Sequence, residues 1–252
     1  SVAIQTEGSA VSETNIDDTL ITINVQTAAG SQTLTRQAIE RGIGTEEVTV
    51  ADLMKRHATL IDSTLLNQAT NGLTNVATSV AYTDASPTAA ELYPKILAGV
   101  SGAEGIFLND AEVDFVVMHP RRWRWLSSQM TSTWPFISGG RVPAQSGAVT
   151  EGVAYDRGIR GYLPAGTAVG TDANIATNLG AGTNEDEVYA VASAELHLWE
   201  DPSAPMFIRA EQTSAKSLGI DLVLYSYFAY YLNRYTGGHA KIAGTGLVTP
   251  PL

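Results

Sequence analysis

The chain has 252 residues, a mass of 26.7 kDa and a formal net charge of -11, from 15 Lys and Arg against 26 Asp and Glu. That balance excludes a protein that grips nucleic acid tightly, since such proteins cluster cations. The absence of cysteine excludes disulfides, zinc–thiolate sites and thiol nucleophiles. Charged residues make up only 16% of the chain, below the usual ~25% of soluble domains, which indicates a surface partly covered by other protein.

The N-terminal stretch, residues 3–28, alternates loosely and carries few bulky apolar side chains. Residues 20–25 (LITINV) have the composition of a strand, and residues 8–18 contain the turn of a long hairpin. An isolated two-stranded hairpin is marginally stable in water, so we expect this one to lie on another surface.

The clearest helix follows Thr49, which we expect to cap it with Asp52 in capping-box position, and Gly72 is its natural stop. A helix of about 22 residues would be roughly 33 Å long, since each residue adds 1.5 Å.

Two further helices are predicted. One begins at Thr88, with Glu91 in capping-box position, and ends near Gly102. The other is short and runs from Pro120 to Met130.

Strands are predicted around these helices, at residues 114–119, 188–199, 206–213, 219–235 and, as a final return strand, 239–244. The stretch 139–182 is rich in Gly, Ala, Thr and Pro and predicts short strands and loops. No apolar run approaches the ~20 residues that span a bilayer, so no membrane partner is expected.

No enzyme, cofactor or metal signature is present: the sequence lacks the nucleophile-elbow, phosphate-loop and dinucleotide-binding motifs. The four histidines lack the i, i+4 spacing of a helical zinc site and are interpreted as packed or solvated; they are His57, His119, His197 and His239. We interpret Asp172, Asn174 and Asn178 as a turn, and the acidic run 184–187 as a solvated loop.

The segment 121–125 (RRWRW) alternates cations with aromatic rings, as a nucleic-acid patch does. On a helix, however, Trp123 and Leu126 face one way and Arg121 and Arg124 another. This geometry favours a helix anchored by tryptophan whose arginines reach acidic partners.

The order of segments resembles the major capsid protein family of tailed bacteriophages, with the Hong Kong ninety-seven type fold. The resemblance is carried by SQTLTRQAIERG (31–42) before the long helix, DFVVMHPRRWRWL (114–126), and the closing strands LHLWEDPSAPMFIRAEQTSAKSLGIDLVLYSYFAYYLNRYTGGHAKIAGTG (196–246). It covers nearly the whole chain, and its specificity lies in the order and spacing of the segments.

The resemblance implies an α+β fold with three parts. These are an extended hairpin (the E-loop, about 1–30) that lies across a neighbouring subunit, a peripheral domain with a long spine helix and a long strand (mainly 31–118 and 206–236), and an axial domain (mainly 119–205 and 237–252). It also implies hexamers and pentamers of an icosahedral shell around double-stranded DNA, assembled in the host bacterial cytoplasm and ending in the virion. Portal, decoration protein and an N-terminal scaffolding segment are the further partners expected; such a segment would suit a chain that begins at Ser1.

One departure concerns the covalent crosslink of some family members, an isopeptide bond between a hairpin lysine and an asparagine, assisted by a glutamate. Residues 1–54 contain no lysine, and residues 222–233 contain no Asp or Glu. We therefore expect no autocatalytic crosslinking.

The candidate contact residues between subunits are charged. We expect hairpin acids to meet arginines of neighbouring copies or else to be merely solvated; the acids are Glu7, Glu13, Asp17 and Asp18, and the arginines Arg36, Arg41, Arg121 and Arg124. Two alternatives remain open: an encapsulin-type shell that encloses protein cargo, and a secreted β-rich binding protein or hydrolase, which would be a monomer near 27 kDa.

Overall fold

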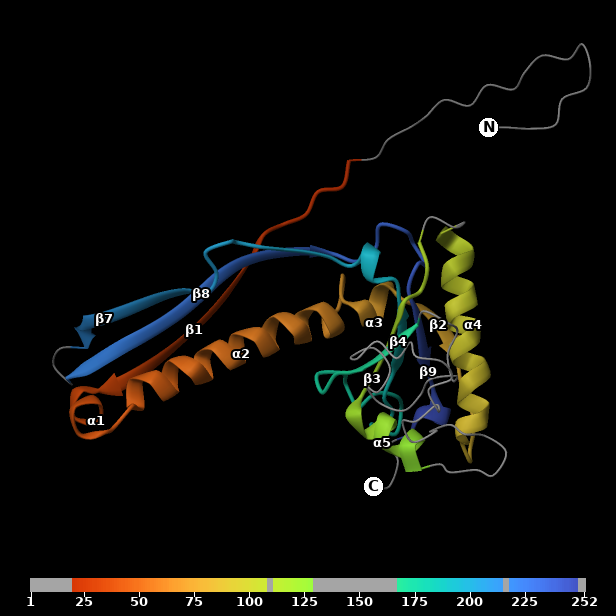
Figure 1. The fold of residues 1–252 in the computed structure, drawn as a ribbon, viewed down its shortest axis with the longest axis horizontal. Coiled ribbons are helices and arrows are strands. Elements are labelled where there is room, and N and C mark those ends of the chain that lie inside the picture. Colours follow the sequence, from red (N-terminus) through yellow and green to blue (C-terminus); the bar gives the residue numbers. More distant parts are fainter. Residues whose placement is uncertain (1–19, 108–110, 129–166, 215–217, 249–252) are drawn as a thin grey trace, which may run out of the picture.

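A long helix and a long strand run side by side along an elongated arm, which ends in a more compact part (Figure 1). The computed structural model describes residues 20–107, 111–128, 167–214 and 218–248. Within them the chain is a mixture of helices and strands, as the α+β expectation requires.

The arm is built on a four-stranded antiparallel sheet whose central strand is β8. Strand β1 pairs with β8 along one edge over ten residues, while β6 and β7 pair with different segments of its other edge. The bounds are β1 Gln26–Thr35, β6 His197–Glu200, β7 Met206–Ser214 and β8 Gly219–Tyr231. The predicted strands at 206–213 and 219–235 are thus confirmed, the second with an earlier end.

The predicted strand at residues 20–25 is wrong. Pairing with β8 begins only at Gln26, opposite Phe228, and no described strand lies beside residues 20–25. The turn region expected at residues 8–18 lies outside the described residues.

Helix α2 (Thr45–Asn67) is the long helix, and its 23 residues match the predicted length. It begins five residues earlier than predicted: Gly44 precedes it with φ 72°, and Glu46 and Glu47 occupy the first turn. Thr49 is therefore inside the helix, where its hydroxyl donates to the Thr45 carbonyl at 2.8 Å. A six-residue helix, α1 (Arg36–Arg41), connects β1 to α2. The short helix α3 (Leu73–Val76) follows α2.

The compact part contains a five-stranded mixed sheet in the order β2-β9-β5-β3-β4. Its strands are β2 Thr78–Ala81, β3 Phe115–Met118, β4 Ala168–Thr171, β5 Val188–Val191 and β9 Ala240–Ala243. Helices α4 (Ala89–Phe107) and α5 (Pro120–Ser128) accompany it. The predicted capping box of α4 is confirmed: the Thr88 amide donates to the Glu91 carboxylate at 2.9 Å, and the Glu91 amide to the Thr88 hydroxyl at 3.3 Å.

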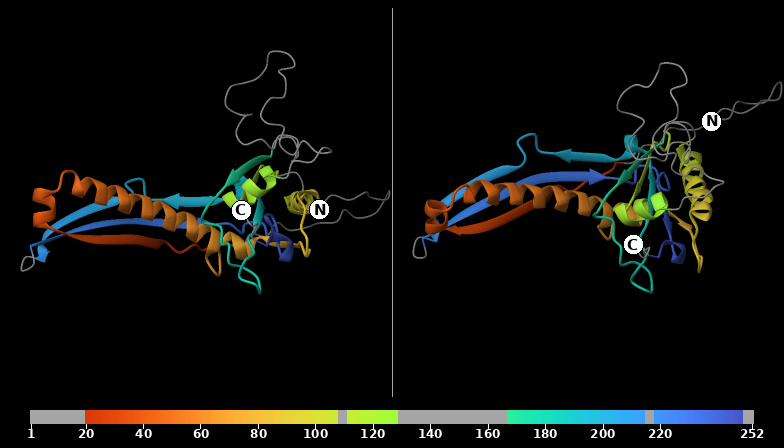
Figure 2. Two further views of the ribbon diagram at one scale, coloured as in Figure 1. Left: turned by 90° about the horizontal axis from the view of Figure 1, so that it is seen from below. Right: turned by 60° about the horizontal axis from the view of Figure 1, so that its bottom comes forward.

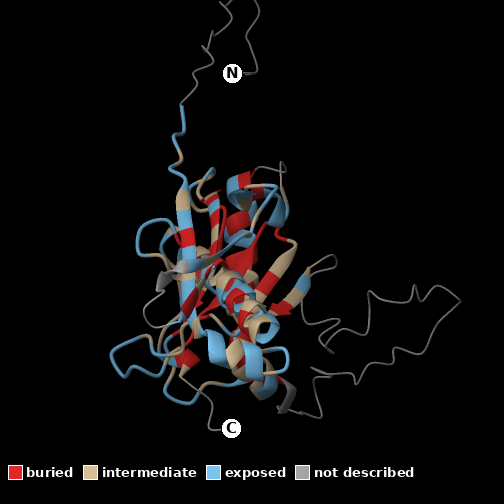
Figure 3. Cartoon of the chain, turned by 90° about the vertical axis from the view of Figure 1, so that its left-hand side faces the viewer, coloured by how far each residue is buried: buried red, intermediate tan, exposed pale blue. Residues whose placement is uncertain are grey.

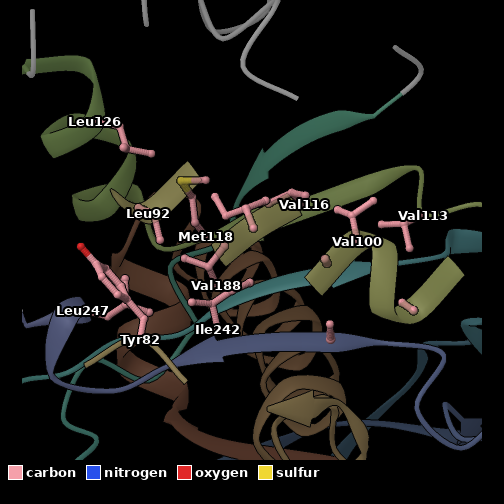
Figure 4. Packing of buried hydrophobic residues seen from close by; sticks show 14 of the residues in the cluster. Tyr82, Leu92, Val100, Val113, Val116, Met118, Leu126, Val188, Ile242 and Leu247 are labelled. Atoms are coloured by element: carbon pink, nitrogen blue, oxygen red, sulfur yellow. The ribbon is translucent and has the colours of Figure 1, made fainter. Parts of the chain in front are cut away.

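The core of the compact part lies between this sheet and helices α4 and α5. Leu92 of α4, Met118 of β3 and Ile242 of β9 point toward one another there and are fully buried (Figure 4). Leu126 of α5 joins the same cluster, as the predicted helix face requires.

The other face of the five-stranded sheet packs against the end of the arm. Strand β5 is buried on both faces. Val188 therefore belongs to the cluster described above, whereas Tyr189 belongs to a second cluster that includes Ile61 and Phe228 of the arm. Viewed along the arm, the buried positions lie mostly inside the molecule and the exposed ones mostly at its rim (Figure 3). The second cluster thus contains residues of both the arm and the compact part.

The five-stranded sheet combines strands from both sides of the expected domain division. Strands β2 and β3 fall in the ranges assigned to the peripheral domain, whereas β4, β5 and β9 fall in those assigned to the axial domain. By sheet membership, the arm consists of residues 26–67 with 197–231.

Candidate assembly surface

The arm sheet has one covered face and one uncovered face. Along β8 the side chains of Leu222, Leu224 and Phe228 are buried, whereas those of Val223, Tyr225 and Tyr227 are only partly covered. This alternation follows from the pleat, which sends successive side chains to opposite faces. Helix α2 lies along the face with the buried set (Figure 2), where Leu53 packs on Leu222 and Leu224.

The uncovered face carries further apolar side chains from the strands beside β8. The register places Met206 opposite Tyr225, Ile208 opposite Val223 and Trp199 opposite Ala229, so their side chains share this face. Tyr227 is 43% exposed, Ile208 47% and Trp199 50%. An apolar, aromatic strip therefore follows the arm with no described helix over it; we call these residues the arm strip (Trp199, Met206, Ile208, Val223, Tyr225 and Tyr227).

Aromatic contacts link side chains along the arm strip. The rings of Tyr225 and Tyr227 meet edge to face with centroids 5.9 Å apart, and Trp199 stacks on His197 at 5.7 Å. Large, preformed aromatic groups are the residue types that protein interfaces enrich.

The tip of the arm exposes a second apolar group. Ile43 is fully exposed, and Val48 and Leu218 are more than half exposed. Charged side chains surround it: Arg209 pairs with Glu46 at 2.9 Å and with Glu211 at 2.6 Å.

The four candidate arginines divide between the two ends of the molecule. Arg36 and Arg41 are on α1 at the tip, whereas Arg121 and Arg124 are on α5 in the compact part (Figure 1). Arg36 pairs with Glu40 at 3.1 Å; Arg41 and Arg124 are exposed and form no ion pair with any residue in the described ranges. The candidate acids, Glu7, Glu13, Asp17 and Asp18, lie outside the described residues, so their contacts with these arginines stay predictions.

A buried arginine was missed by sequence reasoning. Arg122 is 1% exposed, and its Nη2 and Nε donate to one oxygen of Asp186 at 2.9 and 3.1 Å. Its Nη2 also donates to the Val248 carbonyl at 3.0 Å, and its guanidinium lies 5.0 Å from the Trp125 ring centroid. The sequence contains a signal for this burial: Arg122 precedes the apolar Leu126 by four residues, so the two side chains share one face of the helix.

The acidic run 184–187 is predicted to be a solvated loop, which is wrong for its second half: Asn184 is exposed and Glu185 partly exposed, but the next two residues are not. Asp186 and Glu187 are buried and paired, Asp186 with Arg122 and Glu187 with Lys241 at 3.2 Å. Thr74 and Tyr189 also donate to Glu187, at 2.8 and 2.5 Å. Burial raises the pKa of the Tyr189 phenol, and the Glu187 charge adds to the rise.

The remaining polar candidates do not form a metal centre. Within residues 20–107, 111–128, 167–214 and 218–248 there is no group of three or more His, Asp or Glu side chains that could hold a metal ion. The Asp172 carboxylate accepts from the Asn174 amide at 2.8 Å, which confirms the predicted turn. Burial lowers the pKa of His119, and burial also lowers the pKa of His239 to about 4.

No described helix is both long and apolar enough to cross a membrane.

No protein-family description and no curated protein sequence matches the chain. Solved structures do match. A chain of Mycobacterium phage Bobi is 11% identical with a TM-score of 0.62, and the match covers 88% of this chain and 72% of that one. A chain from the capsid of Myoviridae phage XM1 is 15% identical with a TM-score of 0.54, over 88% and 74% of the two chains. The chain has the phage capsid fold.

The capsid fold extends to a protein outside phages. A chain of the holo-SrpI encapsulin complex from Synechococcus elongatus is 11% identical with a TM-score of 0.55, over 89% of this chain and 75% of that one. A phage capsid chain and an encapsulin chain therefore both share this architecture with the present chain.

Proposed function

We propose that this chain is the major capsid subunit of a tailed phage and acts by assembly, with no catalysis. The arm strip carries the proposal. An extended arm with one apolar sheet face uncovered is stabilised when a second molecule covers that face, because apolar surface leaves water.

The parts of the subunit take the roles that the resemblance implies. The arm serves as the peripheral domain between capsomers, and the compact part as the axial domain at the centres of hexamers and pentamers. Of the expected hairpin, residues 26–30 belong to β1 of the arm; the segment before them lies across a neighbouring copy, where the acids Glu7, Glu13, Asp17 and Asp18 meet arginines. Arg41 and Arg124 are the best placed of these, since both are exposed and free of ion pairs within the described residues.

Repeated contacts supply the stability of the shell. A standard interface buries about 1,600 Å² in total, and each subunit of a shell makes several. At about 25 cal/mol per Å², the apolar half of one contact contributes on the order of 20 kcal/mol before the entropy of association is subtracted.

The charge of the chain supports a container for DNA rather than a binder of it. With a net charge of -11, the subunit has no general affinity for phosphate backbones, which leaves enclosed double-stranded DNA free to move during packaging and release. We propose a virion location, assembly in the host bacterial cytoplasm, and portal, scaffolding segment and decoration protein as partners.

Electron microscopy of the purified full chain, with sizing chromatography, tests the proposal. We expect closed particles or rings of six and five subunits; a monomer near 27 kDa under all assembly conditions would overturn it and favour a secreted binding protein or hydrolase. The second candidate, an encapsulin-type shell, is favoured by the likeness to the encapsulin chain. The contents of particles from the native source distinguish the two, because a phage capsid encloses DNA and an encapsulin encloses protein.

A further inference from the structure

A cavity of about 340 Å³ lies where the arm meets the compact part. Its walls come from both: the end of α2 contributes Leu65 and Leu66, the face of β3 turned away from α4 contributes Phe115 and Val117, and Leu232 follows β8. This volume is at the lower end of the size range of small-molecule pockets.

Two carboxyl groups line this mainly apolar cavity. Asp62 comes from α2 and Asp172 from the turn after β4, and both line it. Asn174 holds them in place: its side-chain amide donates to Asp62 at 2.5 Å and its backbone amide to Asp172 at 2.8 Å. Burial raises the pKa of Asp172, and the side-chain hydrogen bond between its carboxyl group and Asp62 and the charge of Asp62 add to the rise.

The charge of these carboxyl groups is not balanced by a cation of the described chain. No Lys or Arg of the described ranges forms an ion pair with Asp62 or Asp172. Among the described residues that line the cavity, the one other titratable side chain is His197, whose Nε2 lies 3.8 Å from Glu195 and so faces a different carboxylate. A partly buried carboxylate pair without a counter-ion favours an occupant that carries positive charge.

We propose that this cavity binds a small apolar primary amine, with its hydrocarbon body between Leu65, Phe115 and Val117 and its ammonium group against Asp62 and Asp172. The ammonium replaces the missing cation, and the apolar walls remove the hydrocarbon from water. Because the walls belong to both parts of the molecule, the bound amine joins the arm to the compact part. This binding does not depend on assembly of the chain into a shell.

Isothermal titration of the purified full chain with 2-naphthylmethylamine, which has twelve non-hydrogen atoms, tests the proposal. The matched alcohol, 2-naphthylmethanol, has the same shape without the charge, and we expect it to bind at least tenfold more weakly. Equal affinity of the amine and the alcohol, or binding of neither, would overturn the proposal.

Variants locate the site. The double substitution Asp62→Asn with Asp172→Asn keeps the oxygen acceptors for Asn174 but removes both charges, and should weaken amine binding at least tenfold. The control Asp52→Asn with Asp84→Asn removes two partly buried carboxylates elsewhere in the chain and should change it less than twofold. Val117→Phe fills the cavity and should abolish binding, while an unchanged circular dichroism spectrum reports that the chain is folded. Amine binding that survives in Val117→Phe, or that falls equally in the control pair, would place the amine elsewhere and refute the inference.

Discussion

Arg122 and Asp186 are 64 positions apart in the chain, yet they form an ion pair in which each side chain is only 1% exposed. The pair connects α5 to the start of β5, and the hydrogen bond from Arg122 to the Val248 carbonyl adds the C-terminal segment. Burial raises the pKa of the Asp186 carboxyl, and the facing guanidinium opposes that rise. Its second oxygen is buried and has no hydrogen-bond partner among the described residues, so the carboxylate depends on Arg122.

Removing one member of this pair should destabilise the chain strongly. We expect Arg122→Met to lower the free energy of unfolding by about 3–5 kcal/mol, because Asp186 is left buried and unpaired. Urea denaturation of the purified chain measures it. Arg124→Met, an exposed position on the same helix, should stay within about 0.5 kcal/mol of the parent. The double substitution Arg122→Met with Asp186→Leu should recover most of the loss; a double variant less stable than Arg122→Met would contradict this account.

His239 should make the chain sensitive to mild acid. It is 3% exposed, and burial lowers its pKa to about 4, below the ordinary 6.5 that it regains on unfolding. Between these values the unfolded chain binds a proton that the folded chain does not, so stability falls as the pH decreases from 6.5 toward 4. At 1.36 kcal/mol per unit, the loss is about 3 kcal/mol.

Thermal unfolding of the parent and of His239→Leu across this pH range measures the contribution of the histidine. The two pH profiles should diverge, with the parent losing more stability toward pH 4. The raised pKa values of Asp172 and Asp186 act in the opposite direction, but both proteins contain them and they cancel in the comparison. Parallel profiles would show that His239 does not carry the acid sensitivity.

Two glycines should respond to alanine in opposite ways. A Cβ at Gly246 would lie 2.5 Å from the Tyr82 ring, so we expect Gly246→Ala to lower stability by about 1–3 kcal/mol. At Gly102, inside α4, a Cβ meets nothing within 4 Å, and alanine should raise stability by about 0.5–1 kcal/mol. Differential scanning calorimetry of both variants checks the signs, and a gain in Gly246→Ala would show that the neighbouring segment relaxes freely.

Particles of this protein should contain no covalent multimers. A hairpin without lysine cannot supply the amine of an isopeptide bond, and the first lysine of the chain is Lys55. Denaturing electrophoresis of mature particles should show one band near the chain mass of 26.7 kDa. A ladder of higher species would mean that another lysine serves as the crosslinking amine.

Local patterns in the sequence predicted the elements whose determinants lie close together in the chain. The Thr88–Glu91 capping box located the start of α4, and Pro120 the start of α5, because each signal lies within one turn of the helix it begins. The long strand β8 was equally visible from its β-branched and aromatic run.

Long-range contacts decided what the sequence could not predict. The predicted strand 188–199 is interrupted at Ser193, whose backbone amide donates to the Asp114 carboxylate at 2.7 Å and which begins a 3₁₀ turn. The acidic run around Asp186 predicts a solvated side chain, because the sequence does not show that the fold brings Arg122 next to it. The arm strip could not be predicted for the same reason. Ile208 and Trp199 share a face with Tyr227 only because β7 and β6 pair with β8.

The arm strip should govern assembly without governing the fold. Tyr227→Lys places a charge on the uncovered face of β8, where the free subunit leaves the side chain 43% exposed, so the stability of the unassembled chain should change by less than about 1 kcal/mol. In an assembled shell the same charge would be buried without a partner, which is costly. We therefore expect the subunit concentration required for assembly, measured by light scattering, to rise at least tenfold. The control Thr59→Lys adds the same charge on the exposed side of α2 and should leave that concentration within about threefold of the parent. If Tyr227→Lys assembles as readily as the parent, the face opposite α2 is not the surface that joins subunits.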